Sequence, residues 1–158
     1  MENLTHIDTM GRPSMVNISQ KQDSQREAIA KGRVKMQVST LDQVRKGKVT
    51  KGNVLTVAQL AGMMAAKQTS SLIPLCHPLL ISDITIEFNL DKENGTVEIT
   101  TSVKSIGKTG VEMEALVATA VTALTIYDMC KAIDRGTQIE NIRLVKKSGG
   151  KSGTIELE

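Results

Sequence analysis

Apolar and polar residues along the chain form a pattern that predicts strands and helices in alternation. Four strands are predicted, over Val34–Val38, Ile81–Leu90, Thr96–Ser105 and Ile139–Val145. The second and third are joined through Asn94–Gly95, which is a strong signal for a hairpin. Lys21–Lys31 is mostly polar and shows no clear period, so it is predicted as a loop or frayed helix that leads into the first strand.

The same pattern predicts three helices. They cover Leu41–Lys46, Val54 to about Lys67, and Val111 to about Ala132. Thr40 is expected to cap the first helix, which Gly47 ends, and Asn53 is expected to cap the second. One apolar face is predicted on the second helix, formed by Val57, Leu60, Ala61 and Met64.

This order of strand, helix, hairpin, helix and strand predicts an α+β fold of the ferredoxin-like kind. We expect a mostly antiparallel, four-stranded sheet with helices packed on one face. The chain has 158 residues, which suits a single domain. Residues 1–14 are predicted to form a mobile arm, and residues 146–158 a glycine- and lysine-rich tail that contributes to the functional site.

The segment Ala115–Tyr127 is apolar or small on every side of its predicted helix. A helix of this kind must be covered all round, and in so short a chain this indicates a second subunit. Its uncharged run is too short for the ~20 residues that a bilayer span needs, and residues 1–14 do not resemble a signal peptide. Cys76 and Cys130 lack metal-site spacing and are expected to be reduced thiols, so we predict a cytoplasmic protein without membrane contact.

Composition narrows the class of ligand. Phe88 and Tyr127 are the only aromatic residues, which argues against a protein that stacks single-stranded nucleic acid on aromatic rings. The formal net charge is +3, and the basic residues gather in four stretches: Lys21–Lys35, Arg45–Lys51, Lys131–Arg135 and Arg143–Lys151. These stretches either converge into a pocket for anions or remain a solvated surface.

Four segments could carry chemistry, three of them within the body of the domain and one in the tail. Asp128 and Lys131 share one helix face, as a surface ion pair or as a partly buried acid–base pair at the rim of a buried region. Gly107–Gly110 opens the last helix and is either a simple turn or a phosphate site, although a P-loop is excluded because Ser102 stands where its first glycine would be. Between Cys76 and Pro78, His77 is either structural or a substrate-binding group.

The tail around Gly150–Lys151–Ser152 resembles the end of a Walker motif, but Val145 replaces its first glycine. The tail is therefore either a flexible polyphosphate-binding segment or simply disordered.

These motifs together resemble the molybdenum cofactor biosynthesis protein C family. The resemblance rests on Leu72–Leu79, Gly107–Leu116, Ala123–Ala132 and Lys147–Gly153, and it covers nearly the whole chain from Ile7. It implies a phosphorus–oxygen lyase that converts 3',8-cyclo-7,8-dihydroguanosine 5'-triphosphate to cyclic pyranopterin monophosphate and pyrophosphate. It also implies a homohexamer built as a trimer of dimers, with sites at the dimer interface. Asn17 departs from the aspartate expected at that position.

The resemblance also implies roles for particular residues. The catalytic residues would be Asp128, Lys131 and Lys51; the substrate-binding residues Leu75, Cys76, His77, Met113, Glu114 and Glu112; and the phosphate-binding residues Lys21, Arg26 and Lys147. No dedicated metal site is expected, although Mg²⁺ could accompany the triphosphate. The alternatives are a non-catalytic nucleotide- or polyanion-binding module and a pterin-binding subunit without turnover.

Overall fold

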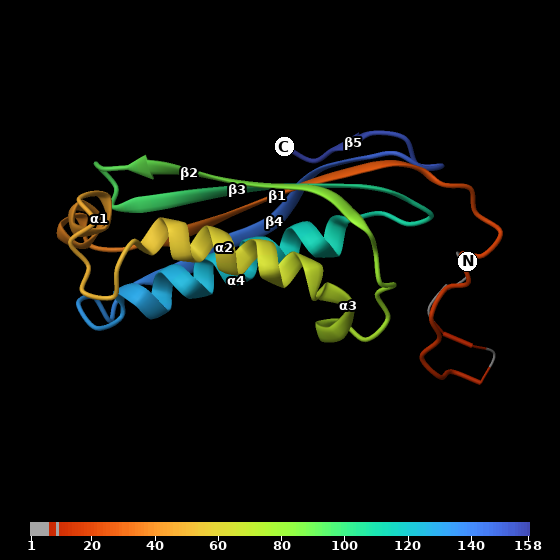
Figure 1. The fold of residues 1–158 in the computed structure, drawn as a ribbon, viewed down its shortest axis with the longest axis horizontal. Coiled ribbons are helices and arrows are strands. Elements are labelled where there is room, and N and C mark those ends of the chain that lie inside the picture. Colours follow the sequence, from red (N-terminus) through yellow and green to blue (C-terminus); the bar gives the residue numbers. More distant parts are fainter. Residues whose placement is uncertain (1–6, 9) are drawn as a thin grey trace.

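One antiparallel sheet and the helices beneath it form two layers in the computed structural model, which describes residues 7, 8 and 10–158 (Figure 1). The elements in chain order are β1 (Ser24–Lys35), α1 (Val38–Arg45), α2 (Val54–Lys67), α3 (Thr69–Leu72), β2 (Ile81–Asp91), β3 (Thr96–Gly107), α4 (Glu112–Cys130), β4 (Gln138–Ser148) and β5 (Ile155–Glu156). The predicted arm, residues 1–14, falls partly outside the described residues.

The strand order β2-β3-β1-β4-β5 confirms the predicted ferredoxin-like α+β fold. All four pairings between neighbouring strands are antiparallel. The sheet has five strands instead of four, because the chain turns back after β4 and pairs Ile155 with Lys147. The tail that was predicted as flexible or disordered therefore includes a short edge strand.

The prediction for Lys21–Lys31 was wrong, because β1 already begins at Ser24 and is the central strand. Its inward positions include Ala28, Ala30 and Gly32, which are too small to show a clear apolar alternation. They are small because α4 crosses β1 closely: a Cβ at Gly32 would lie 2.8 Å from the Thr119 side chain.

Helix α1 also begins earlier than predicted, at Val38 in place of Leu41. Thr40 is buried within its first turn and does not cap it. Gln37 precedes the helix, and its backbone N–H donates to the carboxylate of Asp134 at 2.8 Å. A partner distant in sequence thus fixes this helix start.

Asn53 caps α2 as predicted, and its side-chain oxygen accepts from the backbone N–H of Thr56 at 3.1 Å. The predicted apolar face was wrong, because Val57, Leu60 and Met64 are exposed; Leu60 is 59% exposed. The buried face consists instead of Val54 and small residues, namely Ala58, Gly62, Ala65 and Ala66. These small side chains allow α2 to approach α4 closely.

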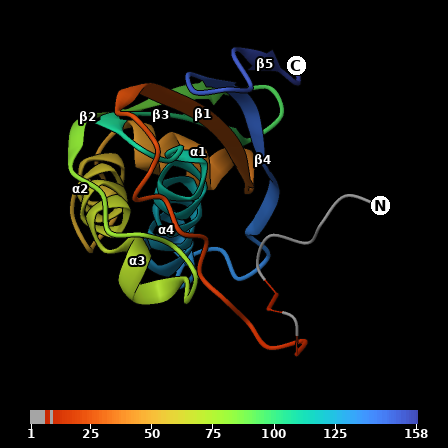
Figure 2. The same ribbon diagram turned by 90° about the vertical axis from the view of Figure 1, so that its right-hand side faces the viewer.

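Helix α4 lies beside α2 and contacts β1, β3 and β4 (Figure 2). It is the one helix in the described part of the chain that is long and apolar enough to cross a membrane by length and composition. Its packing beneath the sheet is that of a core helix. The expected cover on all sides is incomplete in one chain, since Leu124 is 56% exposed.

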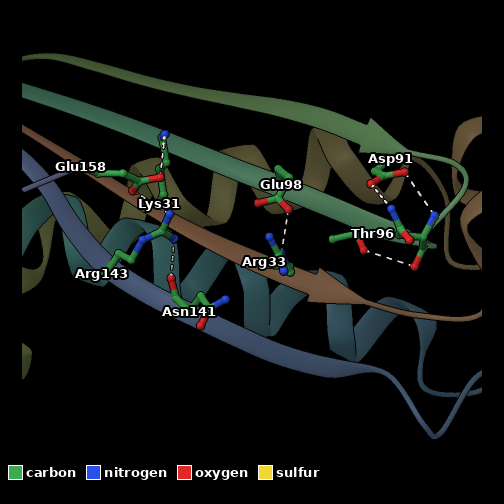
Figure 3. A network of polar contacts seen from close by, with 9 residues as sticks. Lys31, Arg33, Asp91, Thr96, Glu98, Asn141, Arg143 and Glu158 are labelled. Atoms are coloured by element: carbon green, nitrogen blue, oxygen red, sulfur yellow. Dashed lines mark hydrogen bonds and ion pairs between the residues drawn. The ribbon is translucent and has the colours of Figure 1, made fainter.

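The opposite face of the sheet is charged. Arg33 pairs with Glu98 at 2.7 Å, and Glu158 in the tail pairs with Arg143 at 2.6 Å and with Lys31 at 3.5 Å (Figure 3). The helical side carries open apolar surface that includes Leu60 and Leu124, although Ile106 in β3 and Leu157 in the tail are also exposed.

Candidate functional site

A cavity of about 340 Å³ lies at the N-terminal end of α4. It is lined by three segments: the start of α4, the loop that follows α3, and the extended chain before β1. The lining residues are Val16, Ile18, Lys21, Leu75, Cys76, His77, Leu79, Thr109, Gly110, Glu112, Met113 and Glu114. Seven of these are predicted site residues, so the fold brings together Lys21, Leu75, Cys76, His77, Glu112, Met113 and Glu114.

Two glutamates in the first turn of α4, Glu112 and Glu114, line this cavity, and their pKa values are shifted in opposite directions. Burial raises the pKa of Glu114, whose residue is 3% exposed, and the charge of Glu112 raises it further. Burial would also raise the pKa of Glu112, but the hydrogen bond and charge of Lys147 outweigh it, so this pKa is lowered. The surroundings therefore shift the two carboxyl groups in opposite directions, Glu114 toward the neutral acid and Glu112 toward the anion.

The irregular loop before β2 supplies a thiol and an imidazole. Burial raises the pKa of the Cys76 thiol, and the nearby Glu114 charge raises it further, so this thiol stays protonated at neutral pH. Nε2 of His77 lies 2.8 Å from the carbonyl oxygen of Val16. Cys76 and Cys130 are free, as predicted.

The predicted phosphate-binding cations come from separate segments: Lys21 before β1, Arg26 in β1 and Lys147 in β4. The ammonium of Lys147 donates to Glu112, and Nε of Arg26 donates to the carbonyl of Gly107 at 3.4 Å. Burial raises the pKa of Glu112, and the charge of Arg26 adds to the larger effect of Lys147 in lowering it.

The Gly149–Gly150 turn packs directly on the Arg26 guanidinium. A Cβ at Gly150 would lie 1.8 Å from Nη1 of Arg26, and the φ of Gly150 is +73°. The backbone conformation therefore favours glycine at position 150. At Gly149, whose φ is +96°, a Cβ would also lie 2.0 Å from the backbone carbonyl oxygen of Gln25, so glycine lets this turn approach the cations.

The predicted catalytic group lies at the other end of α4. Oδ1 of Asp128 is 2.7 Å from Nζ of Lys131, and Oδ2 is 3.1 Å from Nζ of Lys51. Lys51 also donates to the backbone carbonyl of Asp128 at 2.9 Å, near the negative end of the helix.

In a single chain this group is exposed to solvent, with 56% of the Asp128 side chain accessible. The expectation of a partly buried pair is not met within one chain. Hydrogen bonds from Lys131 and then Lys51 lower the pKa of Asp128. The same hydrogen bond, which Lys131 donates to Asp128, raises the pKa of Lys131 and holds it as a cation.

One chain does not bring the two groups together. Glu114 and Asp128 are fourteen residues apart on one helix, which corresponds to about 21 Å at 1.5 Å per residue. The cavity with its cations thus occupies one end of α4, and the Asp128 group occupies the other.

Sequence reasoning missed three lining residues, Val16, Ile18 and Leu79, whereas Thr109 and Gly110 belong to the predicted turn or phosphate site Gly107–Gly110. A weak signal existed for the first two, since Val16 and Ile18 alternate with polar or exposed neighbours before β1. Among residues 7, 8 and 10–158, no cluster of three or more His, Cys, Asp or Glu side chains is placed to hold a metal ion.

The fold and the cavity define a class: a ferredoxin-like α+β domain with a pocket at the start of its long helix, lined by carboxyl, thiol and imidazole groups and by one lysine. The model of the MoaC family matches residues 15–150. The chain belongs to the MoaC family.

Three curated relatives that match over nearly their whole length are each named cyclic pyranopterin monophosphate synthase. The protein from Thermoanaerobacter pseudethanolicus is 57% identical over 99% of both chains. That from Heliobacterium modesticaldum is 58% identical over 97% of this chain and 96% of its own. The protein from Clostridium acetobutylicum is 54% identical over 98% of this chain and 96% of its own. A designed protein with a ferredoxin fold aligns with a TM-score of 0.35 at 14% identity, covering 84% of this chain and 93% of its own.

Proposed function

We propose that this chain is an enzyme of molybdenum cofactor biosynthesis, a phosphorus–oxygen lyase that forms cyclic pyranopterin monophosphate. Its substrate would be 3',8-cyclo-7,8-dihydroguanosine 5'-triphosphate, and pyrophosphate would leave. The observation that carries the proposal is the cavity at the start of α4, where predicted pterin-facing groups adjoin predicted phosphate-binding cations. Membership of the MoaC family supports the same activity.

The cations serve the phosphate end of this substrate. Ring closure of a hydroxyl onto the α-phosphate expels pyrophosphate, whose developing charge needs fixed positive groups. Lys21, Arg26 and Lys147 would supply these groups. Lys147 donates one of the three N–H groups of its ammonium to Glu112, so the other two would remain for phosphate oxygens.

The purine end needs proton transfers, because the rearrangement to a pterin moves several protons. Cys76 would face the ring as a protonated thiol, and Glu114 would face it as a carboxyl group whose pKa is raised by burial and which therefore takes up a proton more readily than an exposed glutamate. Asp128, with Lys51 and Lys131, would provide the acid–base group.

Both ends of α4 can serve one reaction if two copies combine. A second copy would place its Asp128 group at the first copy's cavity, and the exposed apolar residues on the helical side offer a surface for it, with Leu60 and Leu124 both more than half exposed. The proposed assembly is a homohexamer made of three such dimers, in the cytoplasm. Any Mg²⁺ would arrive with the triphosphate.

Direct turnover tests the proposal. The purified protein should convert the cyclic nucleotide to cyclic pyranopterin monophosphate and pyrophosphate, both measured by chromatography. Asp128→Asn should lower turnover by about 10²-fold or more while the melting temperature and oligomeric state stay unchanged. Tight binding of the nucleotide by the wild type without product would instead indicate the non-catalytic nucleotide-binding alternative.

A further inference from the structure

An extended segment before β1, residues 14–21, runs past the N-terminal end of α4 (Figure 2). We call it the strap. Its side chains alternate: Val16 and Ile18 are half-buried and line the cavity, whereas Asn17 and Ser19 are exposed. Lys21, at its end, also lines the cavity. The strap therefore forms one wall of the proposed substrate site.

The strap is shaped by a turn of its own. The side-chain oxygen of Asn17 accepts from the backbone N–H of Ser19 at 2.9 Å, and the carbonyl of Ile18 accepts from the N–H of Lys21 at 3.0 Å. These bonds set the shape of residues 17–21, but they do not attach the strap to the rest of the molecule.

Within the part of the chain that the structure describes, two hydrogen bonds attach the strap to the body. One joins Nε2 of His77 to the carbonyl of Val16 at 2.8 Å. In the other, Nζ of Lys108 donates to the carbonyl of Ser19 at 2.9 Å. Lys108 directly follows the last residue of β3 and is half-buried, so its backbone is fixed by the end of that strand.

We propose that Lys108 is a positioning residue that fixes the strap over the cavity and thereby places Lys21 for the substrate phosphates. The residue belongs to Gly107–Gly110, where neither a simple turn nor a phosphate site accounts for a lysine directed at a backbone carbonyl. Thr109 and Gly110 line the cavity, whereas Lys108 does not. The inference rests on the proposed function for the identity of the ligand but not for the contact itself.

Amide hydrogen exchange of residues 15–21 in the intact protein tests the contact. Lys108→Ala should raise exchange in this segment by about 3- to 10-fold, the range set by the loss of one net hydrogen bond. Lys108→Arg should restore most of the protection, because it keeps a cationic donor. Lys104→Ala is the matched control, since Lys104 is an exposed lysine that pairs with Glu27 and Asp83 on the outer face of the sheet.

Kinetics then separates positioning from direct contact. KM for the cyclic nucleotide should rise about 3- to 10-fold in Lys108→Ala, with kcat within about twofold of the wild type. Unchanged exchange of the strap in Lys108→Ala would overturn the proposal, and a rise in KM beside it would show that Lys108 binds phosphate directly. If the protein lacks the proposed activity, unchanged exchange still refutes the role, and the affinity for inorganic triphosphate replaces KM as the measure of ligand binding, with an expected weakening of about 3- to 10-fold in Lys108→Ala.

Discussion

Glu112 and Glu114 lie two residues apart in the first turn of α4, yet their surroundings favour opposite charge states. Glu112 faces the cation Lys147, which outweighs the cost of burial. Glu114 is more deeply buried and has no such partner among its pKa determinants, so the neutral acid is favoured. The contrast arises because Lys147 of β4 donates to Glu112 and not to Glu114. The spacing of the two glutamates in the sequence does not predict this difference in pKa.

Glu114→Gln should therefore stabilise the protein at pH 7. The pKa of Glu114 is raised on folding, so the folded chain binds more protons, and the free energy of unfolding falls as pH rises above the ordinary glutamate range. The neutral amide removes this penalty, and the melting temperature should rise by roughly 2–4 °C if about 1 kcal/mol is recovered. The gain should shrink toward about pH 4, where the acid is neutral in both states.

Glu112→Gln is the matched control for this prediction, with the opposite sign. The pKa of Glu112 is lowered on folding, so its stabilising contribution is present at pH 7 and is lost as pH falls through the folded-state pKa. Thermal melts of both variants from pH 4 to 8 provide the measurement. A loss of stability at pH 7 in both variants would contradict the account of Glu114.

The element scale shows what the hydrophobic pattern can and cannot predict. The bounds of α2, its Asn53 cap and the β2–β3 hairpin follow from local rules and are confirmed. The buried face of α2 could not be predicted, because the helix meets α4 through small residues while Leu60 and Met64 point outward. The central strand was partly missed for the same reason, since close helix packing selects small inward residues such as Ala28.

Gly62→Ala tests this close packing. The new Cβ would lie 2.1 Å from Oγ1 of Thr122 and 2.7 Å from Cδ1 of Ile86. Overpacking of this kind costs about 1–3 kcal/mol, against a gain of about 1 kcal/mol in helix propensity. We expect a net loss of about 1 kcal/mol in denaturant unfolding. Ala61→Gly, on the neighbouring half-buried position, is the propensity control, and a stabilised Gly62→Ala variant would show that the helices are not in tight contact.

At the scale of the whole molecule, the predicted site residues form two groups, at opposite ends of α4. The resemblance to a family predicted which residues belong to each group, but neither the sequence pattern nor the single chain shows how the groups meet. The hydrophobic pattern predicts which side chains are apolar and need to be buried. It does not predict whether the same chain or a second copy buries them. Leu60 and Leu124 are exposed in the single chain, and under the proposed function a second copy would cover them.

Subunit complementation tests this composite site most directly. One variant carries Asp128→Asn with an intact cavity, and the other carries Arg26→Ala and Lys147→Ala with an intact Asp128 group. Each should be inactive alone. When the two are coexpressed and pair at random, half of the dimers are mixed and each mixed dimer regains one of two sites, so activity should return to about one quarter of the wild type. A coexpressed sample no more active than either variant alone would contradict a site shared between two chains.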